Sequence, residues 1–233
     1  MVTTFKINYF WEKIDMKIHD ISKSNSILNH FLHQIRDESI QSDRMKFRRN
    51  IERIGEILSY EMSKTLEFQT KKFHTPLSAS SYESLNEEIV VCSILRAGIP
   101  LHTGVLNYFD DADSAFVSAY RKQSETSEDD FDIVVEYLSS PNLEDKTLVL
   151  VDPMLATGLS MLNVLKALKK VGTPKSIHIL SVIGAQPGID LVSNYLPEHA
   201  HLWIGSIDER LNEKGYIIPG LGDAGDLAYG KKM

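Results

Sequence analysis

The sequence contains only one cysteine, Cys92, among its 233 residues. A single cysteine cannot form a disulfide within the chain, which excludes the small secreted domains that depend on several such bonds. Cys92 lies in an apolar run, so we interpret it as a buried, unreactive thiol rather than a nucleophile. This cysteine usage is typical of a reducing compartment, and we expect a cytoplasmic protein.

The sequence also lacks a long apolar run, a surplus of basic residues and any internal repeat. No segment approaches the roughly 20 apolar residues of a transmembrane helix, and the N-terminus mixes charged with aromatic side chains, unlike a secretory signal. With 32 acidic against 25 basic residues the formal charge is -7, so the overall field repels polyanions. We therefore expect neither a membrane nor a nucleic acid as a partner, and any bound anion requires a local site.

What the sequence does contain is enough apolar material for one substantial core, at 42% hydrophobic residues. From Ser26 to Leu66 the apolar residues recur at three- and four-residue steps, which predicts amphipathic helices flanking a sheet. We place an N-terminal helical extension at about residues 1–70 and interpret the whole chain, 1–233, as a single domain.

Beyond Glu88 the pattern changes to short apolar runs that are typical of buried strands. Predicted strands cover residues 89–95, 147–151, 177–183 and 201–207, and predicted helices cover 160–170 and 189–195. This alternation indicates an α/β fold, with a mostly parallel twisted sheet and helices on both faces. Ligands of such sheets collect at the carboxyl ends of the strands, where the loops carry the function.

The stretch at about residues 121–144 has many charges and few apolar anchors. Its part from Gln123 to Asp132 is acidic and polar, whereas Ile133 to Tyr137 has the pattern of a returning strand. We interpret the stretch as a mobile β-arm.

The segment that joins the strand at 147–151 to the next helix has the composition of a phosphate cradle. Small residues allow close backbone approach, N–H groups and the helix dipole favour an anion, and the hydroxyls of Thr157 and Ser160 add donors. Asp152, at the strand end, suits a hydroxyl-rich sugar because a carboxylate accepts two hydrogen bonds. Taken alone, the segment also fits an ordinary turn with Ser or Thr capping. The candidate residues are Asp152, Pro153, Met154, Leu155, Ala156, Thr157, Gly158, Leu159 and Ser160.

Three segments together resemble one enzyme family. Residues 152–158 resemble the signature by which type I phosphoribosyltransferases bind 5-phospho-α-D-ribose 1-diphosphate (PRPP), in the form used by uracil phosphoribosyltransferases. Residues 94–98 (ILRAG) resemble that family's diphosphate loop, and residues 215–226 (GYIIPGLGDAGD) are similar to its uracil-binding segment. The segments occur in the family's order, and the resemblance runs from about residue 25 to the C-terminus. It implies a type I phosphoribosyltransferase fold and, in pyrimidine salvage, transfer of ribose 5-phosphate from PRPP to uracil to give UMP and diphosphate.

The resemblance also assigns roles to the PRPP-binding side chains. It implies that Arg96 binds the diphosphate, and that Arg121, carried on the mobile arm, closes over it. Asp152 and the loop that follows it hold the ribose 5-phosphate, while Asp223 contacts PRPP near the reacting centre. Arg96, Asp152 and Asp223 are therefore the catalytic candidates. Leu159 stands where many relatives have a second glycine, and we expect its side chain to point away from the phosphate site.

The resemblance implies that the uracil-binding segment, at about residues 208–226, binds the base through backbone hydrogen bonds. The N–H groups of Ile217 and Ala224 face the two carbonyl oxygens of uracil, the carbonyl of Gly222 accepts the ring N–H, and Asp223 lies beside them. Cytosine carries an amine in place of one carbonyl, so a donor would face a donor.

Cofactors and partners follow from the same resemblance. Mg²⁺ is expected, bound mainly through PRPP and water, with no metal cage made of protein residues. His30 and His33, like His199 and His201, lack companion ligands and are interpreted as surface or packing residues. Uracil and PRPP are the expected substrates, GTP is a candidate activator, and a homo-oligomer is expected.

Two alternatives stay open at this point. A non-catalytic regulator would keep the fold to sense PRPP or UMP, although intact Arg96, Asp152, Thr157 and Asp223 argue against loss of catalysis. A purine or orotate phosphoribosyltransferase would use another base, but those enzymes lack the segment at 215–226, and orotate would need an additional cation for its carboxylate.

Overall fold

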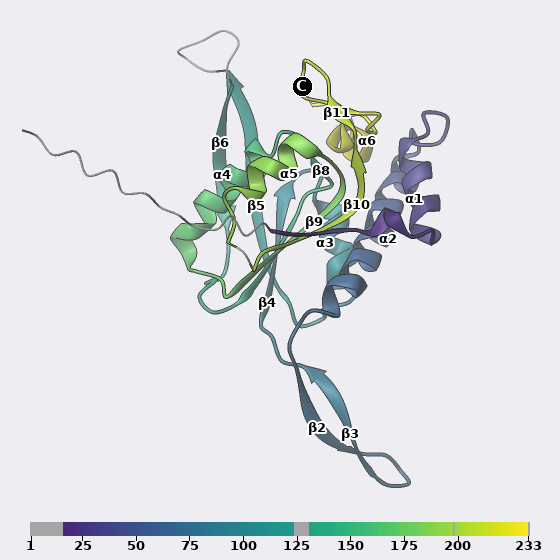
Figure 1. Cartoon of the computed structure of the whole chain (residues 1–233), viewed down its shortest axis with the longest axis vertical. Helices are drawn as coiled ribbons and strands as arrows, with labels where there is room; N and C mark the ends of the chain where they lie inside the picture. The colour runs from purple at the N-terminus through teal and green to yellow at the C-terminus, as the bar shows by residue number, and fades with distance from the viewer. Residues whose placement is uncertain (1–15, 124–130, 198, 233) are drawn as a thin grey trace, which may run out of the picture.

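The computed structural model describes residues 16–123, 131–197 and 199–232. Its centre is an eight-stranded sheet (Figure 1). Seven strands follow the order β1-β10-β9-β7-β4-β5-β6, and the eighth, β8, pairs with β9. The pairings in this sheet are parallel, except for the antiparallel β5–β6 pair. The strands are β1 (Lys17–Asp20), β4 (Ile89–Leu95), β5 (Asp113–Gln123), β6 (Phe131–Ser139), β7 (Thr147–Val151), β8 (Met154–Leu155), β9 (Ser176–Ala185) and β10 (His201–Asp208). The predicted α/β class with a mostly parallel sheet is confirmed.

Helices cover both faces of this sheet because its central strands are apolar on both sides. Successive residues of β7 point to opposite faces, so Leu148 and Leu150 join one buried cluster while Val149 and Val151 join the other. One face carries α4 (Leu159–Leu168) and α5 (Gln186–Ser193), and the other carries α1 (Ile27–Arg36), α2 (Arg44–Ser63) and α3 (Ile99–Leu106), as Figure 1 shows.

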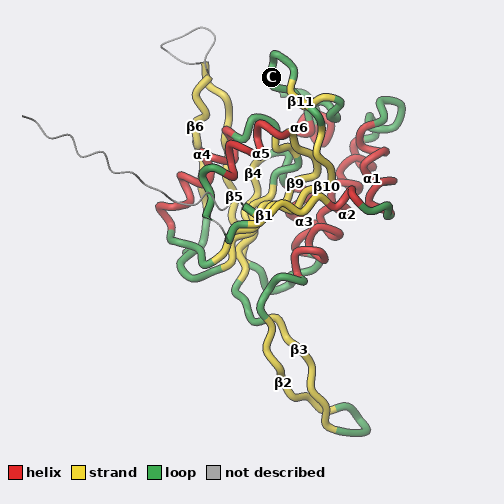
Figure 2. Tube along the Cα trace, viewed as in Figure 1, coloured by secondary structure: helices red, strands yellow, loops and turns green. Residues whose placement is uncertain are grey.

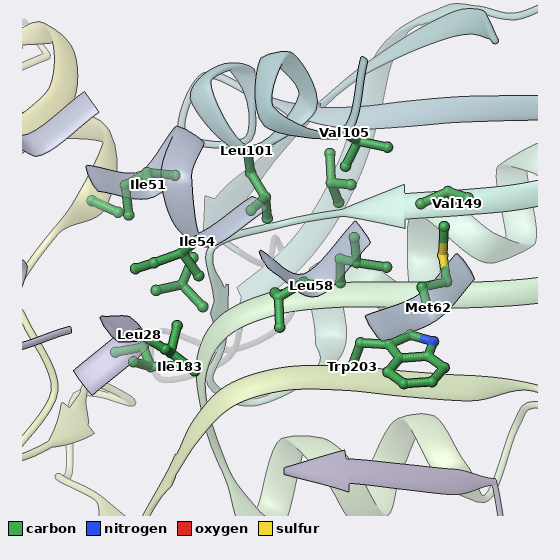
Figure 3. Close-up of a cluster of buried hydrophobic side chains, with 14 of the residues drawn as sticks. Leu28, Ile51, Ile54, Leu58, Met62, Leu101, Val105, Val149, Ile183 and Trp203 are labelled. Atoms are coloured by element: carbon green, nitrogen blue, oxygen red, sulfur yellow. The ribbon is translucent and has the colours of Figure 1, made fainter. Parts of the chain in front are cut away.

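The buried face of helix α2 shows how the sequence builds this core. Asp43 caps the helix by accepting a hydrogen bond from Lys46 N at 3.0 Å. Its buried residues recur at helical spacing, and Met62 joins Trp203 of β10 and Val149 of β7 in the same buried cluster (Figure 3).

The central strand β4 is buried almost along its whole length, and it contains Cys92. Burial raises the pKa of the Cys92 thiol to about 12, which fits the predicted unreactive cysteine.

The N-terminal extension is only partly helical, which corrects the expectation for residues 1–70. Residues 1–15 lie outside the described part of the chain, but Lys17 to Asp20 form an edge strand parallel to β10. The ring of His19 stacks on Trp203 with a centroid separation of 3.8 Å, an interaction between distant residues that a local pattern cannot reveal. A short 3-10 helix, Ile21–Lys23, follows this strand.

Residues 68–85 form a hairpin that the sequence analysis did not assign. Strands β2 (Phe68–His74) and β3 (Ala79–Leu85) pair only with each other and project from the body of the molecule (Figure 2). Every residue of β2 is exposed. The usual signal of alternate burial is therefore missing.

The predicted arm is a second hairpin, made of β5 and β6. The strands pair from Phe116 with Ser139 to Gln123 with Phe131. The boundary expected at residue 144 lies too far along, because Leu143 is fully buried and its N–H donates to Val171 O at 3.0 Å. The tip, residues 124–130, lies outside the described residues, and the arm's mobility stays a prediction.

The C-terminal part adds small elements beside the sheet. They are the 3-10 helix Lys169–Val171 after α4, the paired strands β11 (Arg210–Leu211) and β12 (Ile217–Ile218), and α6 (Ala224–Tyr229). In the part of the chain that the structure describes, no helix is both long and apolar enough to cross a membrane.

Candidate active site

Three loops from distant parts of the chain line one cleft of about 480 Å³. The first loop follows β4, the second follows β7, and the third is the C-terminal segment around β12 and α6. Arg96, Asp152 and Asp223 therefore share one cavity, as the sequence-based hypothesis requires. The cavity lies where β4 and β7 end, the expected edge of a parallel sheet.

The loop after β7 has the geometry of an anion cradle. Gly158 caps α4 with a φ of 78°, and a Cβ there would lie 2.7 Å from the carbonyl oxygen of Gly188. Only glycine fits this turn, because it tolerates a positive φ and leaves room for the backbone of α5. The turn directs the amino end of α4, with its partial positive charge, toward the cleft.

The predicted phosphate-loop residues do not all reach the cleft. Those that line it are Asp152, Met154, Leu155, Ala156, Thr157, Gly158 and Ser160. Pro153 is buried behind the loop, where its carbonyl accepts from Val182 N at 3.2 Å. Leu159 is 41% exposed and does not line the cleft, as expected for a side chain that points away from the phosphate. The short strand β8 was not predicted.

Asp152 has an unusual environment for an acidic residue. Desolvation by burial raises the pKa of its carboxyl from 3.8 to about 7, and a hydrogen bond from Met154 N at 3.3 Å opposes the rise. Part of the residue remains accessible from the cleft. A carboxyl that changes its charge near neutral pH is typical of a functional site.

Arg96 is held in place by the C-terminal helix. Its Nη2 donates to the carbonyl of Gly230 at 3.1 Å and to Asp226 Oδ1 at 3.4 Å, while its Nε is buried without a partner in the described structure. The side chain lines the cleft and is 36% exposed, so part of the guanidinium is available to a ligand.

Strands β11 and β12 present the backbone of the C-terminal segment. Asn212 N donates to Tyr216 O at 2.9 Å, so the next pair, Leu211 and Ile217, belongs to the non-hydrogen-bonded type. The N–H of Ile217 is therefore directed away from β11, although the Ile217 side chain is buried in the core. Of the predicted base-binding residues, Ala224 and Asp223 line the cleft, whereas Ile217 does not and Gly222 lines an adjoining hollow.

Asp223 serves both the cleft and the helix that follows it. It lines the cleft and caps α6, since its Oδ1 accepts from Asp226 N at 2.9 Å. The cap fixes the carboxylate at the point where the third loop meets the first.

The position of Arg121 is described only through its backbone. It lies in β5 opposite Ile133, and its side chain is outside what the structure describes. Its diphosphate contact stays a prediction.

Among the cleft residues that were not individual candidates, three have polar side chains: Lys214, Tyr216 and Lys232. Lys214 and Tyr216 fall within the segment predicted to bind uracil, so their position in the motif is a signal that they lie near the site. Nothing in the sequence around Lys232 distinguishes it from a solvated terminal lysine. Arg96's partner Asp226 was inside the quoted motif but had no assigned role.

Comparisons with known proteins agree with this geometry. A family model described as uracil phosphoribosyltransferase matches residues 22–231. The chain belongs to the uracil phosphoribosyltransferase family. It is 47% identical over 218 residues to the uracil phosphoribosyltransferase of Porphyromonas gingivalis, which covers 94% of this chain and all of that protein.

Two other known proteins are similar over most of the chain. The uracil phosphoribosyltransferase of Methanothermobacter thermautotrophicus is 37% identical over 209 residues, covering 89% of this chain and 93% of that protein. The solved structure of the AQ2163 protein from Aquifex aeolicus superposes with a TM-score of 0.80 at 32% identity, covering 91% of this chain and 98% of that one. The resemblance inferred from three short segments therefore extends to nearly the whole chain.

Proposed function

We propose that this chain transfers ribose 5-phosphate from PRPP to uracil, forming UMP and releasing diphosphate. One observation carries the proposal: Arg96, Asp152 and Asp223, from three loops far apart in the sequence, line a single cleft. Membership of the uracil phosphoribosyltransferase family supports the same reaction. The chain acts as one domain in this proposal, since both buried clusters are built on the same sheet.

The loop after β7 binds the ribose 5-phosphate in this proposal. The amino end of α4 and the hydroxyls of Thr157 and Ser160 bind the phosphate, because oriented donors and the helix dipole favour an anion. Asp152 accepts hydrogen bonds from the ribose hydroxyls in its ionised form. Its raised pKa means that PRPP binding and loss of its proton occur together near neutral pH.

Arg96 binds the diphosphate, and Arg121 completes that site from the arm. In the described residues, no group of three His, Cys, Asp or Glu side chains is placed to hold a metal ion, while Asp152 and Asp223 both line the cleft. This donor set fits Mg²⁺ carried mainly by the diphosphate and by water. When bound, Mg²⁺ neutralises part of the charge on the leaving diphosphate.

The segment from Ile217 to Ala224 holds uracil. The outward N–H of Ile217 and the position of Ala224 in the cleft support backbone donation to the two carbonyl oxygens of the base. The carbonyl of Gly222 accepts the ring N–H in this arrangement. Rigid backbone donors and acceptors suit a neutral, flat base, because a wrong base leaves buried polar groups unpaired.

In the proposed reaction, one bond forms at C1′ of the ribose as another breaks. The C1′–O bond breaks with its electron pair on the diphosphate oxygen, the bond from N1 of uracil to C1′ forms, and the N1 proton is released to the medium. Positive charge develops on the ribose ring and negative charge on the leaving group. The protein acts mainly by positioning the reactants and stabilising these charges.

A turnover assay tests the proposal directly. Purified protein with PRPP, Mg²⁺ and uracil is expected to release diphosphate and form UMP, with no release when uracil is omitted. Absence of uracil-dependent turnover would refute it. Tight UMP binding by calorimetry without turnover would instead favour the non-catalytic regulator.

A competition assay tests the choice of base. Uracil is expected to be consumed in preference to cytosine, hypoxanthine and orotate. Faster turnover of any of the other three bases would overturn the proposed assignment of the Ile217–Ala224 segment.

We also propose a homo-oligomer. The projecting β2–β3 hairpin supports this proposal, because it exposes Phe68, Phe73, Leu77 and Tyr82 away from the body, and apolar side chains gathered on a projecting element favour association. Light scattering at micromolar concentration is expected to give a multiple of the 26.3 kDa chain mass. A monomer mass would contradict it.

Two further proposals, on activation and location, each have a single line of support. Activation by GTP is supported by the family resemblance alone, and adding GTP to the turnover assay tests it, with an unchanged rate as the contrary result. A cytoplasmic location is supported by the single buried cysteine, and fractionation of cells that carry the tagged chain tests it.

A further inference from the structure

The base-binding segment is tied to the N-terminal helix α1 by a buried ion pair. Arg36, the last residue of α1, forms a bidentate pair with Asp208, the last residue of β10, with Nη1–Oδ2 and Nη2–Oδ1 distances of 2.8 and 2.7 Å. The side chain of Asp208 is 5% exposed and that of Arg36 is 20% exposed. The pair is therefore shielded from solvent and geometrically well defined.

Both members of this pair also bind the backbone of one glycine. Arg36 Nη1 donates to Gly220 O at 3.1 Å, and Asp208 Oδ2 accepts from Gly220 N at 2.9 Å. Gly220 is buried with a φ of 64°, and a Cβ there would lie 2.1 Å from Ile217 O. The chain thus folds back on Ile217 at a residue whose two polar backbone groups are both held by side chains.

We propose that Arg36 and Asp208 are positioning residues for the base, acting through Gly220. This inference rests on the proposed function, in which Ile217 and Ala224 donate to the two carbonyl oxygens of uracil. Gly220 lies between these two donors in sequence, so the clamp formed by Arg36, Asp208 and Gly220 sets their spacing. A displaced donor loses its hydrogen bond and leaves a buried polar group unpaired.

Stability alone is a poor explanation for this clamp. Burying an ion pair removes two charges from water, and well-packed apolar residues of similar volume often stabilise a fold at least as well. An apolar pair would connect α1 to β10, but it would hold neither the N–H nor the carbonyl of Gly220. Polar side chains are needed to bind both backbone groups of this turn, which places the main effect of the clamp on the segment that binds the base.

Steady-state kinetics with both substrates separates a positioning role from a structural one. Arg36→Met removes the donor to Gly220 and leaves Asp208 unpaired, so the KM for uracil is expected to rise about tenfold to hundredfold. The KM for PRPP is expected to rise much less than the KM for uracil, because Arg96, Asp152 and the loop after β7 do not touch the clamp, and Asp223 is the one proposed PRPP contact within the segment that the clamp holds. Arg36→Lys is expected to recover part of the loss, since an ammonium group can bind one of the acceptors.

A core variant on the same helix provides the matched control. Leu28 of α1 is fully buried and lies eight residues before Arg36, about 12 Å along the helix, so Leu28→Ala is expected to lower stability while the clamp persists. The proposal expects an unchanged KM for uracil in Leu28→Ala. If Arg36→Met and Leu28→Ala shift this KM equally, or if Arg36→Met shifts the two substrates equally, the clamp is only structural and the proposal is overturned.

Amide hydrogen exchange tests the clamp without turnover, and so separates its failure from failure of the proposed function. Asp208→Ala removes both acceptor oxygens and is expected to speed exchange at Gly220 and at the other N–H groups of residues 217–224, with exchange in β7 unchanged; Pro219 has no N–H. Unchanged exchange at Gly220 would contradict the clamp even in a catalytically active protein. Conversely, faster exchange would support it even if the wild-type chain showed no uracil-dependent turnover.

Discussion

Arg96 Nη2 lies 3.4 Å from Asp226 Oδ1, an ion pair that connects the end of β4 to α6. Both side chains are about a third exposed, so the pair itself contributes little to stability. The pair instead orients the guanidinium of Arg96, because Nη2 also donates to the Gly230 carbonyl and Nε is buried. A guanidinium fixed in this way loses less side-chain entropy when a diphosphate binds.

Replacing Asp226 by alanine is expected to weaken diphosphate binding selectively. The affinity for Mg²⁺-diphosphate and for PRPP should fall about threefold to tenfold, since Arg96 must then be ordered by the ligand. The affinity for UMP, which has no diphosphate, should stay the same, and Asp226→Asn should lose less because it keeps an acceptor. Titration calorimetry with each ligand provides the measurement.

Asp113→Ala is the matched control for this series. Asp113 also pairs with a cation, Lys146 at 2.8 Å, but at the start of β5 and away from the cleft. This variant should bind PRPP and UMP normally. An equal loss of UMP and PRPP affinity in Asp226→Ala would show that α6 as a whole had been disturbed.

Asp152→Asn is expected to damage turnover much more than folding. An asparagine keeps the shape of the side chain but offers the ribose hydroxyls one acceptor oxygen and no charge, so the rate should fall about hundredfold or more. Thermal unfolding should remain cooperative. Turnover equal to that of the unmodified protein would refute the ribose assignment.

The same variant tests the raised pKa of Asp152 through stability. The folded-state value of about 7 exceeds the ordinary 3.8, so the folded protein holds this proton more tightly than the unfolded chain. Its contribution is therefore favourable at low pH and is lost as pH rises from about 4 to 7, on the order of a few kcal/mol. Urea unfolding of both proteins at each pH isolates this contribution: the stability of Asp152→Asn relative to the wild type should increase as pH rises from about 4 to 7.

Two neighbouring residues of the phosphate loop should respond differently to alanine. Gly158→Ala forces a positive φ and a Cβ 2.7 Å from the Gly188 carbonyl oxygen, so the KM for PRPP should rise about tenfold or more and stability should fall by about 1 kcal/mol. Leu159→Ala shortens a side chain that points away from the cleft, and its KM for PRPP should change by less than about twofold. Steady-state kinetics on both variants checks the contrast, and equal effects would contradict the cradle geometry.

Another prediction concerns acid stability and His178, a buried residue of β9. The Nδ1 of His178 accepts from Trp203 Nε1 at 3.1 Å, and burial, with smaller contributions from His201 and His19, lowers its pKa from 6.5 to about 3. The folded state therefore disfavours the protonated form, and stability should fall as pH drops from about 6.5 toward 4, on the order of 2 kcal/mol.

His178→Asn should reduce this acid sensitivity, because its amide oxygen can accept from Trp203 and does not titrate. Stability at pH 7 should be somewhat lower from lost packing. The loss on acidification should shrink to the contribution of the other groups, which include His19, His102 and His201, whose pKa values burial also lowers. Urea midpoints at several pH values measure it. If the variant loses as much stability on acidification as the wild type, a group other than His178 causes the acid sensitivity.

Much of the fold could be predicted from local patterns. The strands at 89–95 and 147–151 are continuous apolar runs because both of their faces are buried, and the helices between Ser26 and Leu66 show a strong helical period because one face is buried. The site motifs were equally readable, because a phosphate cradle and a glycine-rich segment require particular residues at particular places. Arg96, Asp152 and Asp223 could therefore be named before their positions were known.

Other features depend on contacts between distant residues and leave no local trace. The edge strand β1 is held by β10 and Trp203, and the exposed β2–β3 hairpin lacks any alternation of burial. Arg36 reads as an ordinary helix-terminal arginine, and only the tertiary structure brings it to Asp208 and Gly220. The sequence by itself determined which chemistry the loops carry. The tertiary structure decided which residues hold those loops in place, because positioning depends on partners that lie far apart along the chain.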